Sequence, residues 1–490
     1  MAEFDLVITN ARVVTLDNAE PIHVTIGVKD GSIVRLGTDI DATTALDVVD
    51  AGGKLAFPGA VDAHQHWGIY NPLDEDAATE SEASAQGGVT SGISYMRTGQ
   101  YYLNRGGSYA ELMPQVLAAC AGRSRIDYAF HLAPMTAEHI DELPAIVDAF
   151  GVTSFKIFMF YGGFGLHGAS DSQRDFLMLP EGQHYDFAHF EFVMRAIQRL
   201  RRQRPELADR LSLSLHCETA EIMRAYTEIV RNDGTLTGLE AYSASRPPHS
   251  EGLAVAIASY LADVTELPTI NLLHLSSAKA MAAALTMADA FPSIDFRREV
   301  TIGHLLADFH SAAGIGGKVN PPLRSPDDVE ALWDHVLAGE VDWVVSDHAC
   351  CREEMKFGDD HDDVFAAKSG FGGAEYLLPG LVGEGHKRGL PYQRIAQLVS
   401  GAPARRFGLD RKGDIAVGFD ADIALVDPNR SHIVHGSDSR SSQQYTPFEG
   451  LELGATVTDT FVRGNRVWAD GKIQGSPEGR YLFRGPSAAT

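Results

Sequence analysis

The stretch Pro58-Gly59-Ala60-Val61-Asp62-Ala63-His64-Gln65-His66 sets a short apolar run directly before two histidines. Side chains two positions apart on an extended segment project to the same side, so His64 and His66 can bind one ion together. Imidazole nitrogens suit zinc and similar divalent metals. A His-x-His sequence also arises by chance in polar loops, so the interpretation depends on the segments that follow.

Seven more apolar runs follow, separated by longer amphipathic segments, and this alternation is typical of βα units. The eight candidate strands cover residues 60–63, 91–96, 126–131, 153–158, 211–215, 269–275, 295–301 and 341–346. Helical patterns at 187–202, 250–261 and 327–337 lie between some of them. The count favours an α/β fold with a (β/α)8 TIM barrel, although periodicity alone also allows an open sheet.

Both ends of the chain read as strands rather than helices. At the start, residues 24–29 and 33–36 flank Asp30-Gly31, and near the end, 457–463 and 466–469 flank Gly464-Asn465. Both dipeptides are signals for hairpin turns. We therefore predict a small β-sandwich domain built from both chain ends (1–56 and 412–490) around a barrel at 57–411, although two separate sheets would give the same pattern.

The composition limits the classes of function. The 490 residues carry a formal net charge of −25, which argues against nucleic-acid binding because phosphate contacts need basic surface. No stretch reaches the roughly 18–20 apolar residues that span a bilayer, and the start lacks the pattern of a signal peptide. The four cysteines show no paired framework, which suits a reducing compartment. We expect a cytoplasmic protein without a membrane or nucleic-acid partner.

Three further metal-capable residues close or follow apolar runs: His216, His274 and Asp347. Barrel enzymes place their active sites at the C-terminal ends of the strands, so these residues and the His-x-His pair are predicted to meet at one rim. Any one of them could be a hydrogen-bonded core residue. Five at one rim are harder to attribute to chance.

A lysine interrupts the apolar stretch Gly151-Val152-Thr153-Ser154-Phe155-Lys156-Ile157-Phe158-Met159. Burial lowers the pKa of an amine and favours its neutral form. A neutral amine can react with carbon dioxide to give a carbamate, whose two oxygens can bridge two metal ions. Lys156 could instead extend to solvent or pair with a carboxylate, and spacing alone does not decide between these roles.

Taken together, the motifs resemble the cyclic amidohydrolases, the branch of the amidohydrolase superfamily that holds hydantoinases, dihydropyrimidinases, allantoinases and dihydroorotases. The resemblance covers nearly the whole chain. Besides the two stretches above, it rests on Leu215-His216-Cys217-Glu218, Ser245-Arg246-Pro247-Pro248, His274-Leu275-Ser276-Ser277, Lys318-Val319-Asn320-Pro321-Pro322-Leu323-Arg324, Ser346-Asp347-His348, Gly418-Phe419-Asp420-Ala421-Asp422 and Tyr445-Thr446-Pro447-Phe448-Glu449-Gly450.

The resemblance implies two divalent metal ions per chain, zinc first, with manganese, cobalt or iron as alternatives. The implied ligands are His64, His66 and Asp347 for the more buried ion, His216 and His274 for the other, and Lys156, as N6-carboxylysine, between them. A hydroxide that also bridges the ions would attack the ring carbonyl. Relatives of this kind are commonly tetramers, so a homotetramer acting on a small cyclic amide is expected.

The same resemblance implies roles beyond the metals. Asp347 would carry the proton of the attacking water to the leaving nitrogen, and Tyr161 would donate to the developing oxyanion. Backbone groups around Asn320 and Ser369 would hold the amide edge of the ring. Arg97, just past the second candidate strand, could bind a carboxylate or carbonyl of the substrate, with a salt bridge or a loop anchor as an equally good alternative.

The chain departs from its relatives at several points. Trp67-Gly68 stands where dihydroorotases have Leu-Arg, which disfavours that activity. Ser369-Gly370-Phe371-Gly372-Gly373 stands where hydantoinases have Asn-Gly-x-Pro-Gly, and two long segments, 162–185 and 351–373, look like active-site loops. The stretch 369–373 and the segment 162–185, which looks longer than the corresponding hydantoinase segment, suggest a larger or substituted ring.

Two other functions remain open from the sequence. Some proteins of this fold have lost their metals and act as scaffolds, but the ligand set here is intact. A hydrolase of linear amides, such as a deacetylase or dipeptidase, is the other alternative. The spacing of Lys156 and Tyr161 favours cyclic substrates.

Overall fold

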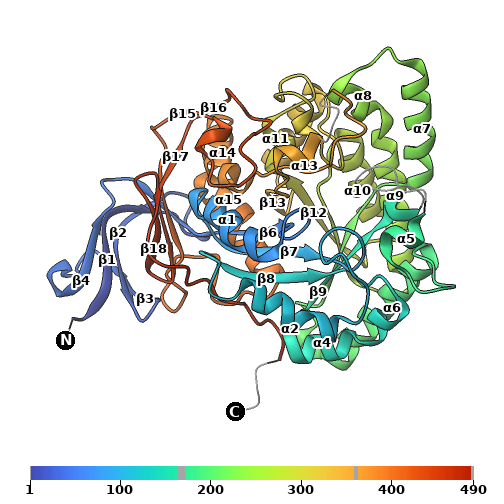
Figure 1. Ribbon diagram of the computed structural model, residues 1–490. Helices are drawn as coiled ribbons and strands as arrows, with labels where there is room; N and C mark the ends of the chain where they lie inside the picture. Colours follow the sequence, from blue (N-terminus) through green and yellow to red (C-terminus); the bar gives the residue numbers. More distant parts are fainter. Residues whose placement is uncertain (1, 163–171, 358–361, 487–490) are drawn as a thin grey trace.

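The computed structural model describes residues 2–162, 172–357 and 362–486 (Figure 1). Its centre is a sheet of eight parallel strands in sequence order: β6 (Ala60–Gln65), β7 (Val89–Met96), β8 (Asp127–Leu132), β9 (Ser154–Phe158), β10 (Ser212–His216), β11 (Thr269–Leu272), β12 (Asp295–Thr301) and β13 (Trp343–Val345). The first and last strands approach each other, because Gln65 bridges to His348 and the Ser346 amide donates to Asp62 Oδ1 at 3.0 Å. The sheet is thus a nearly closed barrel, and the predicted fold class is confirmed.

Helices surround the barrel (Figure 1). The longer ones are α1 (Leu73–Gln86), α2 (Tyr109–Cys120), α4 (Leu143–Phe150), α6 (Phe187–Gln203), α7 (Ala220–Asp233), α8 (Gly238–Ser245), α9 (Pro248–Val264), α10 (Ala278–Ala290) and α12 (Pro326–Leu337). The short ones are α3 (Ala137–Asp141), α5 (Gln173–Leu177), α11 (Ile302–Leu306), α13 (Glu353–Phe357), α14 (Leu377–Gly380), α15 (Tyr392–Ala396) and α16 (Ala402–Arg406). The helical patterns predicted at 187–202, 250–261 and 327–337 correspond to α6, α9 and α12.

Local capping explains where two of these helices begin. The Asp186 side chain accepts hydrogen bonds from the first amides of α6, and the Ser325 side chain does the same for α12. Such caps satisfy amide groups that have no partner within the helix. The helix bounds therefore follow from short-range sequence, and the helices fix the strands between them.

Both chain ends build one mixed sheet beside the barrel, as the sequence predicts. Its strands are β1 (Phe4–Val13), β2 (Ile22–Lys29), β3 (Ser32–Gly37), β4 (Ala45–Asp50), β5 (Leu55–Pro58), β14 (Ile423–Asp427), β17 (Thr456–Val462), β18 (Asn465–Ala469) and β19 (Lys472–Ile473). The antiparallel pair β14–β5 joins the two ends. The pair β15 (His432–Ile433) and β16 (Glu452–Leu453) stands apart. The division of the chain into 1–56, 57–411 and 412–490 stays a prediction.

One of the two predicted hairpin turns is displaced by a residue. Asp30 and Gly31 both have positive φ, 51° and 75°, as expected for a two-residue turn. In the second hairpin the turn residues are Arg463 and Gly464, with φ of 47° and 76°, rather than Gly464 and Asn465. Asn465 already pairs with Val462 in the ladder, and this register leaves Arg463 at the turn position.

The two long segments predicted as loops contain short helices, α5 in the first and α13 in the second. Residues 163–171 and 358–361 of these segments lie outside the described residues. The sixth barrel strand is also shorter than predicted: β11 ends at Leu272, so His274 lies beyond it with a positive φ of 35°.

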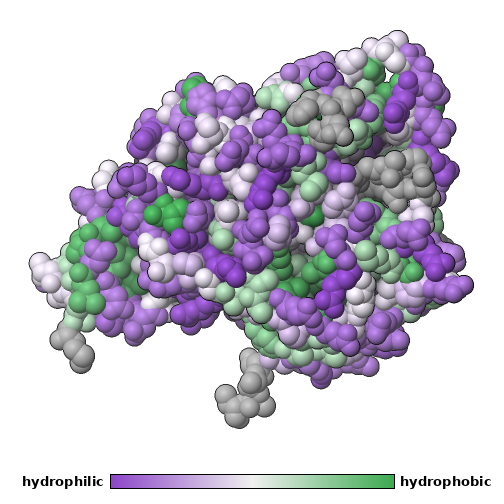
Figure 2. Space-filling model, in the orientation of Figure 1, coloured by the Kyte–Doolittle hydropathy of each residue, from purple (hydrophilic) through white to green (hydrophobic). Residues whose placement is uncertain are grey.

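The surface is mostly hydrophilic on the face that Figure 2 shows, with apolar side chains gathered over the region of β1–β4. Exposed apolar residues of β3 and β4 are Val34, Leu46 and Val48. None of the described helices combines the length and apolar character needed to cross a membrane.

Candidate metal centre

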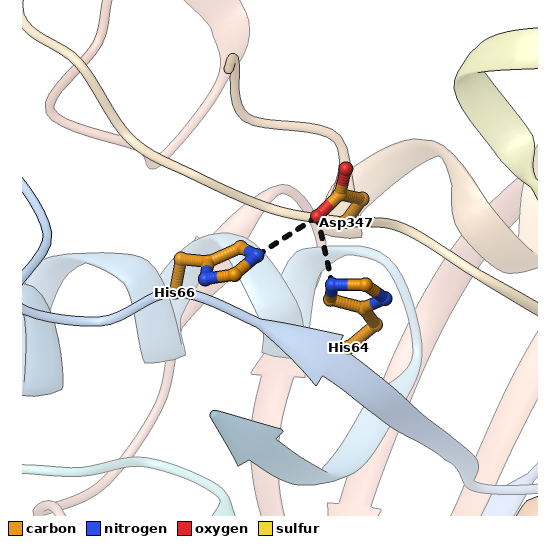
Figure 3. Close-up of side chains that lie close together, drawn as sticks. All are labelled: His64, His66 and Asp347. Atoms are coloured by element: carbon orange, nitrogen blue, oxygen red, sulfur yellow. Dashed lines mark hydrogen bonds and ion pairs between the residues drawn. The ribbon is translucent and has the colours of Figure 1, made fainter. Parts of the chain in front are cut away.

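Three side chains from the two ends of the barrel sheet converge on one point. His64 and His66 come from the end of β6, and Asp347 follows β13 (Figure 3). Asp347 Oδ1 lies 3.1 Å from His64 Nε2 and 3.0 Å from His66 Nε2. A positive φ of 56° at Asp347 turns the chain just past the strand. The two imidazoles and the carboxylate could hold one metal ion.

Two more histidines lie next to this group. His216 is the last residue of β10, and its ring centre lies 4.2 Å from that of His274. The His274 ring is in turn 5.3 Å from the His64 ring. Among the described residues, His274 Nδ1 is buried without a hydrogen-bond partner. Such a buried ring nitrogen can bind a metal ion through its lone pair.

Lys156 projects from the middle of β9 into the same cluster. Its Nζ lies 3.1 Å from His64 Nε2 and 4.0 Å from the centre of the Tyr95 ring. The side chain neither reaches solvent, being 1% exposed, nor forms an ion pair with a carboxylate of the described residues. Burial lowers the pKa of Lys156 to about 7, so a substantial fraction is the neutral amine near neutral pH.

Burial also lowers the pKa of the histidines. The pKa of His64 falls well below its ordinary value through burial, with a further contribution from the Lys156 charge. Burial lowers the pKa of His216 to about 4 and holds the pKa of His274 well below its ordinary value. These imidazoles are therefore neutral at pH 7 and carry lone pairs, as metal binding requires.

Two glutamates that the sequence analysis did not single out hold the histidines in place. Glu299 of β12 lies 2.7 Å from His64 Nδ1 and also accepts from the Trp343 indole and the His274 amide. Glu218 lies 2.7 Å from His216 Nε2. Carboxylates behind a histidine are a usual feature of metal sites, because they fix the ring and its tautomer. In the sequence, Glu299 lies within the predicted strand 295–301 and Glu218 within the motif Leu215-His216-Cys217-Glu218, but neither carboxylate was assigned a role.

A cavity opens beside the cluster at the C-terminal end of the barrel. It is lined by His66, Ile69, Tyr102, Lys156, Phe158, Phe160, His216, His274, Val319, Asn320, Asp347, Ala349, Ser369 and Gly370. Its floor is therefore polar and metal-capable, whereas much of its wall is aromatic or aliphatic. Small-molecule sites commonly combine an apolar wall with a few placed polar groups.

Asn320 presents a fixed polar group to this cavity. Its Oδ1 accepts from Tyr242 Oη at 2.5 Å and from Arg246 Nη1 at 3.1 Å. A guanidinium can only donate, so Arg246 fixes which end of the amide is the oxygen. Nδ2 is then left buried without a partner among the described residues. This NH2 group can donate to a carbonyl of a bound molecule.

The backbone near Ser369 is largely engaged within the protein. The Ser369 carbonyl accepts from Tyr70 Oη at 2.5 Å, and the Gly370 amide donates to the Lys318 carbonyl at 2.9 Å. Lys356 bridges the carbonyls of Lys318 and Gly370 at 2.9 and 2.7 Å. Ser369 thus lines the cavity on a firmly held segment, and its predicted backbone contact with substrate stays a prediction.

Tyr161 and Arg97 lie next to the cavity but are not among its lining residues. Arg97 is fully buried; its Nε donates to Tyr161 Oη at 2.9 Å, and its guanidinium lies 4.9 Å from the centre of the Phe176 ring. Its Nη1 donates to the Thr98 carbonyl at 3.0 Å, and its Nη2 is buried without a hydrogen-bond partner, so among the described residues no carboxylate pairs with Arg97. The roles of both residues towards substrate stay predictions.

Comparison with known proteins gives a consistent result. The Amidohydrolase family profile matches residues 311–467. An allantoinase of Rubrobacter xylanophilus is 33% identical over 488 residues, which are 98% of both chains. Among solved structures, a D-hydantoinase superposes with a TM-score of 0.83 at 25% identity over 98% of both chains. A D-hydantoinase (dihydropyrimidinase) from Thermus sp. gives 0.81 at 28% identity, covering 98% of this chain and 99% of the other.

Proposed function

The chain belongs to the cyclic amidohydrolases of the amidohydrolase family, and from this premise we propose that it opens the ring of a cyclic ureide with two bound divalent ions. It is a metal-dependent hydrolase of a cyclic amide. Allantoin and hydantoin share a five-membered ureide ring, so we take that ring as the first candidate substrate. The observation that carries the proposal is the convergence of Lys156, Asp347 and four histidines in one cluster beside the cavity.

The residues present fit the metals that the family implies. His64, His66 and Asp347 would hold one ion, and His216 and His274 the other. Divalent ions bound there would lower the pKa of a water molecule and polarise the carbonyl that it attacks. The unpartnered His274 Nδ1 and the low histidine pKa values support this assignment. Zinc suits the imidazole-rich ligand set best, and manganese, cobalt or iron remain alternatives.

Lys156 would join the two metal sites as a carbamate. The neutral amine attacks the carbon of CO2, a C–N bond forms, and one proton leaves to solvent, which gives N6-carboxylysine. The low pKa of Lys156 and the lack of a competing carboxylate partner both support this reaction. The carbamate would add a negative charge where basic groups outnumber acidic ones.

The remaining residues would bind and orient the ring. Asn320 Nδ2 would donate to a ring carbonyl, while Phe158 and Phe160 pack against the face or substituent of the ring. Asp347, which contacts both His64 and His66, would carry a proton from the attacking water to the leaving nitrogen. Tyr161 would donate a hydrogen bond to the developing oxyanion, and a Tyr161→Phe variant tests this role.

A turnover screen tests the proposal directly. The purified chain, supplied with zinc, manganese or cobalt, is assayed with hydantoin, allantoin, dihydrouracil, a cyclic imide and linear N-acetyl and N-carbamoyl amino acids, and its metal content is measured. We expect ring opening of at least one cyclic ureide with about two ions per chain. Turnover of the linear amides alone would favour the deacetylase-like alternative, and a metal-free active protein would contradict the mechanism.

We also propose that the chain assembles into a homotetramer. The exposed apolar side chains Val34, Leu46 and Val48 on β3 and β4 offer a surface that self-association would cover. Light scattering of the purified protein measures the mass directly. A monomer at micromolar concentration would contradict this part of the proposal.

A further inference from the structure

Tyr102 lines the cavity, and the proposed function gives it no role. It follows β7, its side chain is buried, and its hydroxyl lies 2.6 Å from His66 Nδ1. The other nitrogen of the same ring, His66 Nε2, lies 3.0 Å from Asp347. Tyr102 therefore lines the cavity while its hydroxyl contacts a proposed metal ligand.

The backbone around Tyr102 is held in an unfavourable conformation. Tyr101, Tyr102 and Asn104 all have positive φ, between 51° and 62°, a region that residues other than glycine rarely adopt. Such conformations persist where surrounding contacts impose them, and they gather at functional sites. Three in four consecutive residues indicate that this short loop is shaped for a particular placement of its side chains.

The contacts that impose this shape are present on both sides of the loop. Gly99 donates to the Arg105 carbonyl at 2.9 Å and closes the loop, and the Tyr101 amide donates to Asn104 Oδ1 at 2.8 Å. The Tyr102 amide donates to the Ile69 carbonyl at 3.2 Å, which ties the loop to the segment after His66.

Arg97 supports the ring of Tyr102 from behind. Its guanidinium carbon lies 5.3 Å from the ring centre, a cation–π distance. The Tyr102 ring thus contacts Arg97, while its hydroxyl contacts His66.

We propose that Tyr102 is a positioning residue that links the metal-binding state of His66 to a hydrogen bond with the substrate. A histidine that gives its Nε2 lone pair to an ion carries its proton on Nδ1. His66 Nδ1–H then donates to the Tyr102 oxygen, and the phenol proton is left to donate into the cavity. A hydroxyl can serve as acceptor and donor at once because its hydrogen rotates about the C–O bond.

In the absence of an ion the arrangement reverses. The proton of His66 sits on Nε2, facing Asp347, and the Tyr102 hydroxyl donates to the bare Nδ1. The hydrogen-bond donor in the cavity wall is therefore available only when the His66 site is loaded. This inference rests on the proposed function, because it assigns metal binding to His66 and a substrate to the cavity.

The test compares Tyr102→Phe with Tyr101→Phe. The second variant removes a hydroxyl from the same strained loop, but the Tyr101 ring packs on Tyr70 and Phe176 rather than on His66. Cobalt affinity of both sites is measured by competition with a chromophoric chelator, together with the visible spectrum of the bound cobalt. Ring opening is then measured at saturating metal.

We expect Tyr102→Phe to lower the cobalt affinity of one site about 10- to 100-fold and to leave the affinity of the other site unchanged. This is the range for losing the hydrogen-bond partner behind a histidine ligand. Its kcat/KM at saturating cobalt should stay about 10-fold below wild type, the value of one lost hydrogen bond. Tyr101→Phe should match wild type in both measurements.

Unchanged cobalt affinity and spectrum in Tyr102→Phe would overturn the inference while leaving the proposed function intact. If the wild-type protein opened none of the rings, the cobalt measurement would still decide whether Tyr102 holds His66. If Tyr102→Phe does not fold, the cobalt affinity and spectrum are measured on Tyr102→Asn instead, because asparagine tolerates a positive φ.

Discussion

Two buried clusters of ionisable groups in this protein follow opposite rules. The metal cluster (His64, His66, Lys156, His216, His274 and Asp347) lies at the C-terminal end of the barrel. The junction cluster (Asp127, Lys412, Asp420, Asp422 and Arg463) lies where the barrel meets the sheet of the chain ends. Lys156 and Lys412 are both buried, 1% and 5% exposed, yet their pKa values move in opposite directions.

The difference lies in the partners. Burial opposes the charge of Lys412, but carboxylates at 2.6, 2.7 and 3.0 Å raise its pKa above the ordinary value. Arg463 pairs with Asp127 in the same cluster. Lys156 has no such partner, so burial prevails and its pKa falls to about 7. The junction cluster pairs its own charges and is structural. The metal cluster leaves its basic groups neutral, so that their lone pairs can bind metal ions.

The largest effect is expected for Lys156→Ala, which removes the neutral amine from the metal cluster. Loss of the bridging group should reduce kcat by roughly 10⁴-fold, about 5 kcal/mol of transition-state stabilisation. Formate, acetate or propionate in the assay should restore part of the activity by standing in for the carbamate. Steady-state kinetics with and without the acids measures both effects.

The control for that variant is Lys356→Ala. Lys356 is also buried with its pKa lowered to about 7 by burial, but it donates to two backbone carbonyls and lies outside the metal cluster. Added acids should not improve this variant. Full activity of Lys156→Ala without any acid would remove the bridging role.

Lys412→Met should affect stability rather than chemistry. It leaves Asp127 and Asp422 buried near each other with one cation fewer, and breaking a buried ion pair costs about 3 kcal/mol or more. Denaturant unfolding measures the loss, and kcat of the folded protein should stay at the wild-type value. A variant as stable as wild type would show that the junction cluster contributes nothing.

The pH dependence of that loss has a definite sign. In the wild type, the raised pKa of Lys412 keeps its contribution constant at any pH below its ordinary pKa of about 10, and the contribution is lost only as the pH rises above that. Without the cation, the carboxylates bind protons more readily in the folded state than in the unfolded chain. The deficit of Lys412→Met should therefore shrink as the pH falls from 7 towards 5, and a deficit that grows would contradict the account.

Removal of the metal ions should distinguish the two clusters through an effect of intermediate magnitude. Loading at 100 times the dissociation constant stabilises a folded protein by about 2.7 kcal/mol, because the unfolded chain lacks the site. We expect chelation to abolish activity and to lower the unfolding midpoint by the corresponding amount. Calorimetry of Lys412→Met measures the same quantity in the variant. If chelation lowers its unfolding midpoint by the same amount as in the wild type, the metal ions act on the metal cluster alone.

Glu299→Gln should sharpen the comparison within the metal cluster itself. Burial raises the pKa of Glu299 to about 8, and a cation near His64 would favour its ionised form. The amide keeps the shape but not the charge, so metal affinity should fall about 10- to 100-fold. Metal titration of the apoprotein measures this. Wild-type affinity would mean that Glu299 only fills space.

The smallest effect is expected at Asn320. Asn320→Ala removes the free NH2 group and should lower kcat/KM about 10-fold with the metal content unchanged, the cost of one hydrogen bond to substrate. Tyr242→Phe, which removes only the hydroxyl behind the Asn320 oxygen, should lose less. An equal loss in both variants would indicate that orientation matters more than donation.

Much of the architecture was predictable because it depends on short-range patterns. The apolar runs before His64, His216 and Asp347 predicted strands, and parallel strands in a barrel bring their C-terminal ends to one rim. The metal-capable residues were therefore predicted to lie together, and the structure places them so. Lys156 was singled out by its apolar neighbours alone.

The supporting residues escaped the sequence analysis. Glu299 is 235 positions from His64, and Tyr102 is 36 positions from His66 within a loop with no recognisable motif. Asn320 was assigned a backbone contact, whereas its side-chain amide carries the unpartnered donor. Their roles depend on which atoms meet, and sequence spacing does not encode that meeting.

The sequence by itself determined the pattern of strands and helices, the β-rich character of both chain ends and the identity of the metal-capable side chains, because periodicity and strand ends are local properties. The near-closure of the eight strands and the pairing of the two chain ends in one sheet came from the tertiary structure. The tertiary structure alone decided which carboxylate stands behind which histidine, that Tyr102 rather than Tyr161 lines the cavity, and that Lys156 lacks the partners that Lys412 has. Those facts follow from distances between segments far apart in the chain. At such sites the pKa and the hydrogen bonds of a side chain are set by its neighbours in space.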